Sequence, residues 1–217
     1  MNGKLIVIDA TDGCGKTTQV NRLLERLKEN GHKTEMLKFP QHEKSYFGNL
    51  IDCFLNGHFG DPTTLNPYLV SALYAADRFE ASKRLKEWLA EDKIVVLDRY
   101  VSANQIHQGS KIKNDTEREN FLNWLEKIEH GIFELPRPDI ILYLDVSPET
   151  SRRIMTERGK LDGNEENLDY QRMSREQSLR LVSKMNNWKR ITCEDGGNLL
   201  PIEIIHEKIW AIVQKMV

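Results

Sequence analysis

Three short stretches of the chain are apolar at nearly every position, and this pattern restricts the fold more than any other feature of the sequence. They are residues 5–8, 94–97 and 140–146. A strand with one face in water alternates apolar and polar residues, whereas a strand covered on both faces is continuously apolar. The three stretches therefore predict buried strands of a parallel sheet that is covered by helices on both faces.

Segments with helical periodicity lie between these strands. Residues 16–29 carry an apolar stripe that ends at Asn30-Gly31, and residues 65–91 repeat apolar side chains at the same spacing. Strands that alternate with helices are typical of the α/β class. The pattern therefore predicts an α/β fold.

Weaker patterns complete the sheet. Residues 36–39 form a strand pattern with a polar interruption, residues 188–193 form another that charged residues interrupt, and residues 201–216 predict a closing amphipathic helix. We therefore expect a parallel sheet of about five strands flanked by helices. All 217 residues then belong to one domain, in which the polar segment 157–169 is a surface loop or a lid.

The composition excludes several classes of function. The chain has 31 basic and 33 acidic residues and a net charge of -2, so it lacks the overall positive charge of a dedicated nucleic-acid binder. Its three cysteines are widely spaced, which argues against a disulfide framework and favours the cytoplasm. Since no stretch of about 18 apolar residues occurs, we expect no membrane span.

The strongest local motif lies between the first strand and the first helix. Residues 8–18 read Ile-Asp-Ala-Thr-Asp-Gly-Cys-Gly-Lys-Thr-Thr, which places a phosphate-binding loop where a P-loop belongs. In such a loop Gly13 and Gly15 let the backbone N–H groups approach phosphate, Lys16 neutralises the β and γ oxygens, and the Thr17 hydroxyl can bind Mg²⁺. The predicted ATP-binding residues here are Ala10, Thr11, Asp12, Gly13, Cys14, Gly15, Lys16, Thr17 and Thr18.

Two readings of this loop stay open. Ala10 stands where the usual pattern has its first glycine, and an ordinary strand-to-helix turn is the alternative to a P-loop. Cys14 is interpreted as a spacer whose backbone N–H binds phosphate, against the alternative of a thiol with a lowered pKa at a helix N-terminus.

A second motif, Asp98-Arg99-Tyr100, directly follows a buried strand. Ligands of open parallel sheets bind at the carboxyl ends of the strands, so these side chains should lie beside the loop. Asp98 can hold Mg²⁺ through water, and Arg99 can bind a phosphoryl group with two hydrogen bonds. The alternative is a structural ion pair.

A third motif lies on the helix pattern. Tyr74 and Arg78 are one turn apart, so an aromatic plane and a fork of donors could bind one flat ligand. The alternative is a solvated face without function.

Together these motifs resemble the thymidylate kinases, which are P-loop nucleoside monophosphate kinases. Residues 9–18 resemble the family's acidic phosphate-binding loop, Phe39-Pro40 its Phe-Pro after the second strand, residues 74–78 its Asp-Arg helix, and residues 98–109 its long Asp-Arg-Tyr signature. The sequence departs from the family pattern at Ala10, at Ala103, where Ser is usual, and at Gln41-His42, where Arg is common.

The resemblance implies the reaction ATP + dTMP → ADP + dTDP with Mg²⁺, and a homodimer. It implies that Tyr74 stacks on thymine, that Arg78 and Asn104 bind the polar edge of the base, and that Phe39 packs on the sugar side. Asp12 would contact the 3′-hydroxyl or the metal shell, and Arg99 the acceptor phosphate. The dTMP-binding residues so implied are Asp12, Phe39, Pro40, Tyr74, Arg78, Arg99, Asn104 and Gln108, and the predicted metal ligands are Thr17 and Asp98.

The resemblance also bears on which arginine meets the charge that develops during transfer. Members of this family use an arginine in the loop or basic residues in the lid, and residues 11–14 contain no arginine. The lid segment supplies Arg158, and Arg153 on the preceding helix is predicted to assist at ATP. The alternative is a solvated basic run. The predicted catalytic residues are Asp12, Lys16, Arg99 and Arg158.

Two other classes of function compete with this interpretation. A deoxynucleoside kinase would phosphorylate a 5′-hydroxyl. Such enzymes have a motif similar to Glu-Arg-Ser after the third strand, where this chain has Asp98-Arg99-Tyr100. A GTPase-type switch would carry Asp-x-x-Gly after that strand and an Asn-Lys-x-Asp motif, and the sequence has neither.

Overall fold

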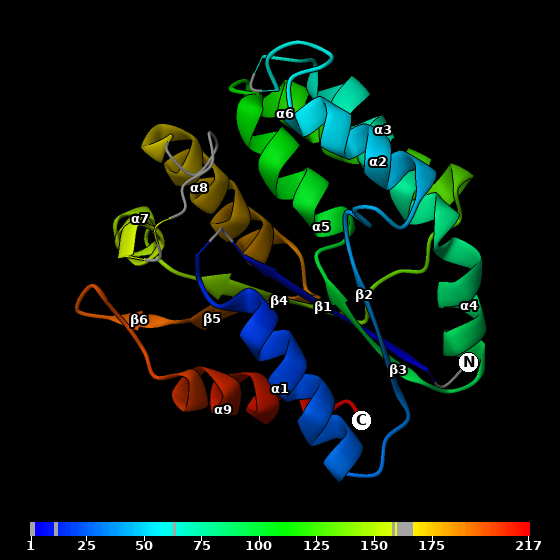
Figure 1. Cartoon of the computed structure of the whole chain (residues 1–217), viewed down its shortest axis with the longest axis vertical. Coiled ribbons are helices and arrows are strands. Elements are labelled where there is room, and N and C mark those ends of the chain that lie inside the picture. The colour runs from blue at the N-terminus through cyan, green and yellow to red at the C-terminus, as the bar shows by residue number, and fades with distance from the viewer. Residues whose placement is uncertain (1–2, 11–12, 63, 158, 160–166) are drawn as a thin grey trace.

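A five-stranded parallel sheet forms the centre of the molecule (Figure 1). The structure is a computed structural model that describes residues 3–10, 13–62, 64–157, 159 and 167–217. The strand order is β2-β3-β1-β4-β5, and every neighbouring pair is parallel, which confirms the predicted fold class. The strands are β1 (Lys4–Ala10), β2 (Thr34–Lys38), β3 (Ile94–Asp98), β4 (Ile140–Asp145) and β5 (Trp188–Thr192).

Helices cover both faces of the sheet, as the continuously apolar strands predict. Alternate residues of β1 point to opposite faces: Ile6 and Ile8 belong to a core formed with α1 (Lys16–Glu29) and α9 (Ile202–Val213). Leu5 and Val7 belong to a second core. Its helices include α4 (Ser82–Ala90), α5 (Val101–Ala103) and α8 (Leu168–Lys184).

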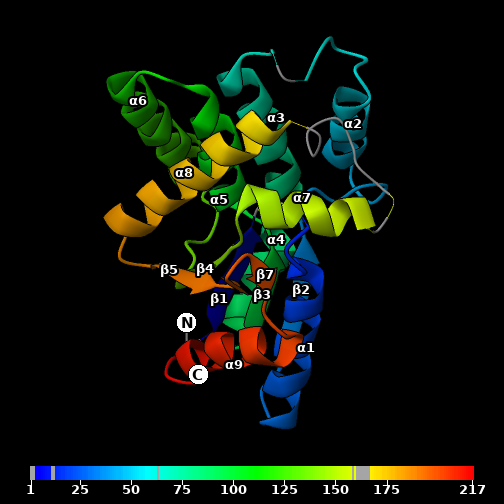
Figure 2. The ribbon, with the colours of Figure 1, turned by 90° about the vertical axis from the view of Figure 1, so that its left-hand side faces the viewer.

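The remaining elements connect these strands and helices. They are α2 (Tyr46–Leu55), α3 (Pro67–Glu80), α6 (Asp115–Glu126), α7 (Pro148–Glu157), the π-helical turns η1 (Asn104–Gln108) and η3 (Lys127–Ile132), the 3₁₀ turn η2 (Gly109–Lys111), and the hairpin of β6 (Glu194–Asp195) and β7 (Asn198–Leu199). Figure 2 shows α7 lying between α8 and this hairpin.

The strand register brings two segments of the site together. Ile8 of β1 pairs with Asp98, the last residue of β3, and β1 continues for two further residues to Ala10, which pairs with Leu144 of β4. The loop after β1 therefore begins two residues beyond the level at which β3 ends. A carboxylate at that end lies within reach of the helix that follows the loop.

The helical pattern over residues 65–91 is divided into two helices, because α3 ends at Glu80 and α4 begins at Ser82. Ala81 donates its N–H to the carbonyl oxygen of Arg78, a bond of the tighter 3₁₀ type that closes the last turn. Periodicity did not show this break, since no glycine or proline marks it.

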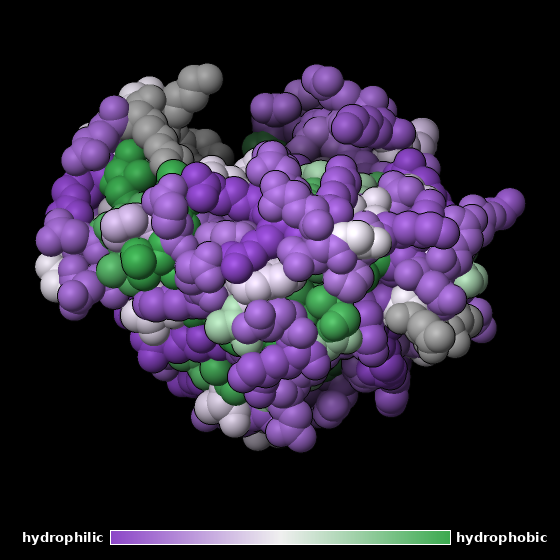
Figure 3. All heavy atoms as spheres, turned by 90° about the horizontal axis from the view of Figure 1, so that it is seen from below, coloured by the Kyte–Doolittle hydropathy of each residue, from purple (hydrophilic) through white to green (hydrophobic). Residues whose placement is uncertain are grey.

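The side of the molecule formed by α1 and α9 is mostly hydrophilic, with small separate apolar patches (Figure 3). Ion pairs join the two helices there: Arg22 lies 2.9 Å from Glu203, and Arg26 lies 2.5 Å from Glu207. Among the described residues, no helix is long and apolar enough to cross a membrane.

Candidate active site

The loop after β1 turns sharply into α1 through two glycines. Gly13 and Gly15 have φ values of 77° and 78°, in the left-handed region that favours glycine. A Cβ on Gly13 would lie 2.7 Å from Cγ of Met155, so the loop also packs closely against α7. Cys14 is only 2% exposed, as suits a residue that contributes its backbone. Thr11 and Asp12 lie outside the described residues.

The cation and the carboxylate predicted for phosphate and metal binding lie against each other. The Lys16 ammonium forms an ion pair with Asp98, and Thr17 Oγ1 lies 3.3 Å from the other Asp98 oxygen. Asp98 is fully buried, whereas Thr17 and Thr18 are exposed at the start of α1. Lys16 is therefore also the counter-charge of a buried carboxylate, a role that sequence reasoning did not assign to it.

A second buried carboxylate lies beneath the loop. Asp9 is fully buried and accepts hydrogen bonds from Ser102 Oγ at 2.6 Å and from the Ala10 N–H at 2.9 Å. Burial raises the pKa of Asp9, while the charges of Arg99 and Lys16 oppose this shift. Sequence reasoning missed Ser102 as a partner, although it lies within the Asp-Arg-Tyr signature.

The backbone turns abruptly at the end of β3. Arg99 has φ of 66°, a left-handed conformation that is uncommon for a residue with a side chain and is often found at functional sites. Its N–H donates to the carbonyl oxygen of Ile8, and the side chain lines a cavity beside the strand ends. Arg99 therefore lines the cavity directly after the end of β3.

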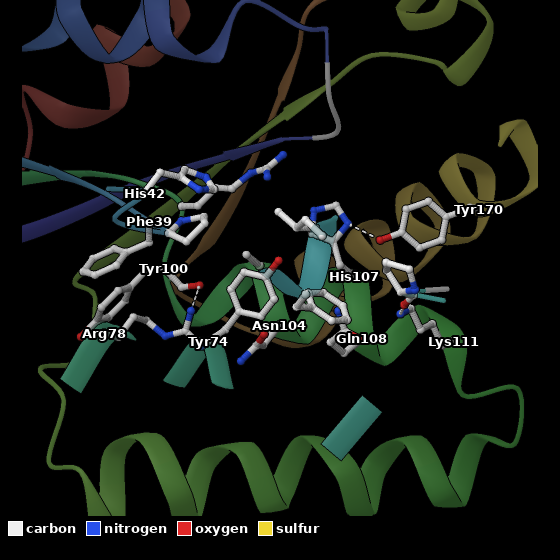
Figure 4. Close-up of a pocket in the computed structure, with 16 residues that line it drawn as sticks. Phe39, His42, Tyr74, Arg78, Tyr100, Asn104, His107, Gln108, Lys111 and Tyr170 are labelled. Atoms are coloured by element: carbon white, nitrogen blue, oxygen red, sulfur yellow. Dashed lines mark hydrogen bonds between the residues drawn. The ribbon is translucent and has the colours of Figure 1, made fainter. Parts of the chain in front are cut away.

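The cavity measures about 240 Å³ and lies between the strand ends, α3, η1 and α8 (Figure 4). Of the residues predicted to bind dTMP, all that the structure describes line it: Phe39, Pro40, Tyr74, Arg78, Arg99, Asn104 and Gln108. Sequence reasoning missed other lining residues: Tyr100, His107, Lys111 and Tyr170. His42, which follows the Phe-Pro dipeptide, also lines the cavity.

Tyr74 presents a neutral aromatic ring in this cavity. Burial raises its pKa to about 12, although Arg99 and Arg78 act in the opposite direction. The Phe54 ring of α2 meets the Tyr74 ring edge-on at 6.3 Å between centroids and supports it. The Tyr74 ring is thus fixed by α2 and α3 together.

Arg78 does not lie on a solvated helix face, so that alternative is wrong. Arg78 is 1% exposed and binds the carboxylate of Glu129 through Nε and one terminal nitrogen, both at 2.6 Å. Its other terminal nitrogen donates to the carbonyl oxygen of Tyr100 at 3.3 Å. Glu129 lies in the turn η3, and no motif in the sequence marks it.

Asn104 joins the same buried network. Its amide nitrogen donates to the carbonyl oxygen of Ser71 at 3.1 Å and to Glu129 Oε1 at 3.0 Å. Gln108, one turn further along, has an Oε1 that is buried without a hydrogen-bond partner among the described residues. Both side chains come from η1 and line the cavity.

Asp77, the residue before Arg78, fixes the loop that follows β2. Its buried carboxylate accepts from the Gln41 N–H at 3.1 Å and from Ser45 Oγ at 2.6 Å. His42 forms a close contact with Asp52 of α2 through Nδ1. The Asp-Arg dipeptide therefore serves two parts of the site, since Asp77 holds the loop and Arg78 faces the cavity.

At its far end the cavity is bounded by α8 and by the loop before α3. Tyr170, in the first turn of α8, shares a hydrogen bond of 3.0 Å with His107 Nδ1, and their rings are stacked (Figure 4). Lys111 donates to the carbonyl oxygen of Pro62 at 3.1 Å, and burial lowers the pKa of Lys111.

The helix before the predicted lid contacts the small hairpin. Arg153 of α7 donates to the carbonyl oxygen of Gly197 at 2.8 Å, so in this structure its guanidinium meets the β6–β7 turn. Arg175 of α8 binds the buried Asp145 at the end of β4, so α8 is held to the sheet. Arg190 of β5 binds the same carboxylate. Arg158 lies outside the described residues.

The parallel sheet carries a glycine loop between β1 and α1, a lysine at the start of that helix and a cavity beside the strand ends. Together these features define a P-loop nucleotide-binding kinase. The thymidylate kinase family matches residues 8–209. Human thymidylate kinase is 30% identical over 215 residues, which cover 95% of this chain and 88% of the human protein. A bacterial thymidylate kinase from Thermoanaerobacter sp. is also 30% identical, over 99% of both chains.

The fold agrees with this relationship. The solved structure of thymidylate kinase from Candida albicans superposes with a TM-score of 0.74 at 23% identity and covers 98% of this chain and 92% of that one. The chain belongs to the thymidylate kinase family. It is therefore a nucleoside monophosphate kinase that transfers a phosphoryl group from ATP to dTMP, giving dTDP.

Proposed function

We propose that the chain works as one P-loop kinase domain in which the β1–α1 loop holds ATP and the cavity beside it holds dTMP. The observation that supports this division most strongly is the position of Arg99, which lines the cavity directly after the strand that carries Asp98. An acceptor phosphate at this place would lie between the loop and the cavity. In-line transfer needs that alignment of donor and acceptor.

On the donor side, the loop N–H groups and Lys16 would hold the ATP phosphates. Because the Lys16 ammonium is paired with Asp98, binding of ATP exchanges one anionic partner for another and leaves the carboxylate available. The loop residues assigned to ATP together with Lys16 are Ala10, Thr11, Asp12, Gly13, Cys14, Gly15, Thr17 and Thr18. Asp12 is also assigned to the acceptor sugar or the metal shell.

Mg²⁺ fits the residues present. The hydroxyl of Thr17 and the carboxylate of Asp98 are hard oxygen ligands 3.3 Å apart, and such ions are held by one or two protein oxygens together with phosphates and water. We assign Thr17 and Asp98 to the ion. When bound, Mg²⁺ would neutralise charge on the transferred phosphate.

On the acceptor side, the thymine ring would stack on Tyr74, with its polar edge toward Arg78 and Asn104. Phe39 and Pro40 would enclose the sugar side, and Gln108 supplies a buried oxygen that needs a donor. Arg99 would bind the acceptor phosphate. We propose that Arg158 in the lid segment acts on the transferred phosphate and that Arg153 on α7 assists at ATP.

We further propose a homodimer in the cytoplasm, with no nucleic-acid or membrane partner. Large apolar side chains are exposed on two neighbouring helices: Tyr46 on α2, and Tyr68, Leu69 and Phe79 on α3. Exposed apolar side chains that gather on one surface mark interaction sites. Light scattering of the wild type and of Leu69→Lys tests the dimer, which the variant should weaken.

A coupled assay of ADP release against a panel of nucleosides and nucleoside monophosphates tests the reaction. We expect turnover with dTMP and none with thymidine. Turnover of thymidine but not dTMP would instead identify a deoxynucleoside kinase. Retention of GTP in preference to ATP would favour a nucleotide-dependent switch.

A further inference from the structure

We propose that His42, held by Asp52 of α2, is a second residue that binds the phosphate of the acceptor nucleotide, and that it does so only as an imidazolium. His42 lines the cavity, and its Nδ1 pairs with the Asp52 carboxylate. Binding of the acceptor phosphate would then depend on a proton as well as on Arg99. This inference rests on the dTMP site proposed above.

The strand register places His42 at the phosphate end of the cavity. Lys38, the last residue of β2, pairs with Asp98, the last residue of β3. The N–H of Phe39 donates to the carbonyl oxygen of Asp98 at 3.0 Å. The segments that follow the two strands therefore start side by side, and they carry His42 and Arg99 into the lining of one cavity.

The other basic side chains that line the cavity, among the described residues, lie elsewhere or are already paired. Figure 4 shows His107 and Lys111 at the opposite end of the cavity from His42. The Arg78 guanidinium is bound to a buried carboxylate. Arg99 and His42 are therefore the side chains whose charge can balance a phosphate at the strand ends.

One guanidinium does not balance an acceptor phosphate. A phosphate monoester carries a charge of about −1.5 to −2 near neutral pH. Arg99 has a single positive charge, and this charge also acts on the buried carboxylate of Asp9. An imidazolium at position 42 would supply the second positive charge.

Asp52 orients the ring for this role. An ionised carboxylate can only accept hydrogen bonds, so the Nδ1 of His42 carries the hydrogen that meets Asp52. Nε2 is then the ring atom left for a ligand. In a neutral ring that atom is an acceptor and would repel phosphate, whereas an imidazolium donates from both nitrogens. Only the protonated ring therefore suits a phosphate.

The loop that carries His42 is fixed before any ligand binds. Asp77 holds it on both sides of His42, through the Gln41 N–H and Ser45 Oγ. Glu43, the next residue, has φ of 57°, a left-handed conformation that is uncommon for a residue with a side chain and is often found at functional sites. A ring held in place loses little conformational entropy on binding, which favours affinity.

Histidine is also the side chain whose charge changes between about pH 5 and 8. The other charged or titratable groups around His42 are Asp52, which pairs with it, Tyr74 and Arg78 of α3, and Arg99 after β3. Burial raises the pKa of Tyr74 to about 12, and arginine stays charged. We therefore expect the affinity for the acceptor phosphate to fall as the pH rises and His42 loses its proton.

The first test compares the wild type with His42→Gln and His42→Arg, using dTMP as substrate and thymidine as a competitive inhibitor. Thymidine has the same base and sugar without the phosphate. His42→Gln should raise the KM for dTMP about tenfold or more, as expected for loss of a hydrogen bond to a charged group, and leave the inhibition constant of thymidine unchanged. His42→Arg should keep a KM near that of the wild type. Exposed His58→Gln is the matched control and should change neither value.

The second test measures the charge on the ring. The ratio of the KM for dTMP in the wild type to that in His42→Arg should rise at least about threefold from pH 6.5 to 8.5, because arginine keeps its charge. This ratio cancels the ionisation of dTMP itself. Asp52→Asn should raise the KM for dTMP in the wild type and have little effect in His42→Arg, where the charge no longer depends on a partner.

A surface ion pair without a role in binding is the alternative, since His42 and Asp52 are 41% and 33% exposed and such pairs contribute little to stability. An unchanged KM for dTMP in His42→Gln, or equal losses for dTMP and thymidine, would overturn the proposal. A ratio that does not change with pH, or an equal effect of Asp52→Asn in both backgrounds, would also overturn it. A wild type without dTMP kinase activity would instead refute the proposed function.

Discussion

The two sides of the site hold their polar groups in opposite ways. At the loop between β1 and α1, the groups that would meet phosphate and metal are paired with each other, as Lys16 is with Asp98. In the cavity, Arg78 and Asn104 are held by Glu129, a residue that need not meet the ligand at all. The first arrangement must be exchanged when a ligand binds, whereas the second can stay as it is.

This difference matches what each side must recognise. Phosphate groups are highly charged, so they can displace an internal ion pair when ATP binds. Before ATP arrives, that ion pair satisfies the buried carboxylate of Asp98. A base offers only a few neutral hydrogen bonds. If the side chains that bind the base are already fixed, they lose little conformational entropy on binding, and this increases affinity. The predictions below test whether the two sides are independent.

The largest effect is expected for Lys16→Ala, which should lower kcat by about 10³-fold, the upper end for removal of one preorganised donor. It should also lower the free energy of unfolding by up to about 3 kcal/mol, because it leaves the carboxylate of Asp98 buried without its counter-charge. Steady-state kinetics and urea unfolding measure the two effects.

The double variant Lys16→Ala/Asp98→Asn separates these roles. It should recover most of the lost stability and none of the activity. Lys28→Ala, an exposed change in the last turn of the same helix, is the control and should change neither quantity. If Lys16→Ala kept more than a tenth of kcat, the assignment of the loop to ATP would be wrong.

Arg158→Ala should have the next largest effect. If the lid arginine meets the charge on the transferred phosphate, kcat falls by about 10²-fold, below the 10³–10⁵ range of arginine fingers. The KM for dTMP should change little. Lys160→Ala should lose less, because an ammonium lacks the bidentate fork. A wild-type kcat for Arg158→Ala would leave Arg99 as the arginine at the reacting phosphates.

Tyr74→Ala tests the cavity side alone. Loss of a stacking ring costs about 1–3 kcal/mol per base, so we expect the KM for dTMP to rise roughly 10-fold or more with the KM for ATP unchanged. Tyr74→Phe keeps the ring and should keep both values. Equal changes in both KM values would show that the two sides are coupled and would contradict the comparison drawn above.

The smallest effect concerns stability away from the site. Burial and the nearby charge of Arg26 lower the pKa of His206 from 6.5, while Glu207 acts in the opposite direction. The unfolded chain then takes up the proton more readily, so the free energy of unfolding should fall as the pH is lowered through 6.5. His206→Leu should reduce this dependence in urea titrations from pH 7.5 to 5, whereas exposed His58→Asn should not. An unchanged pH dependence in His206→Leu would exclude this histidine as its source.

Local patterns were enough to predict the sheet and the loop. The continuously apolar strands, the glycines before Lys16 and the charged residues after β3 each act within a few positions of the chain. Of the eight residues assigned to dTMP, those that the structure describes line one cavity, because parallel strands end at a common edge.

Contacts between distant segments could not be predicted in this way. Glu129 lies 51 positions from Arg78 and follows a helix with an ordinary charged surface, so only the packing of η3 against α3 brings the two together. The end of α3 at Glu80 was missed for the same reason. The sequence around Ala81 permits a continuous helix. In the structure the chain turns there, and Arg78 before the turn and Leu85 after it are both buried.

The register of β1 and β3 limits how this chain can change in evolution. Asp98 reaches Lys16 because Ile8 pairs with Asp98 while β1 runs on to Ala10. Successive side chains of a strand point to opposite faces, so deleting one residue between Ile94 and Leu97 would shift the register and turn the carboxylate to the other side of the sheet. Insertions and deletions should therefore accumulate in the connections at the amino ends of the strands, such as the turn at Gly31, and be rare within β1 and β3.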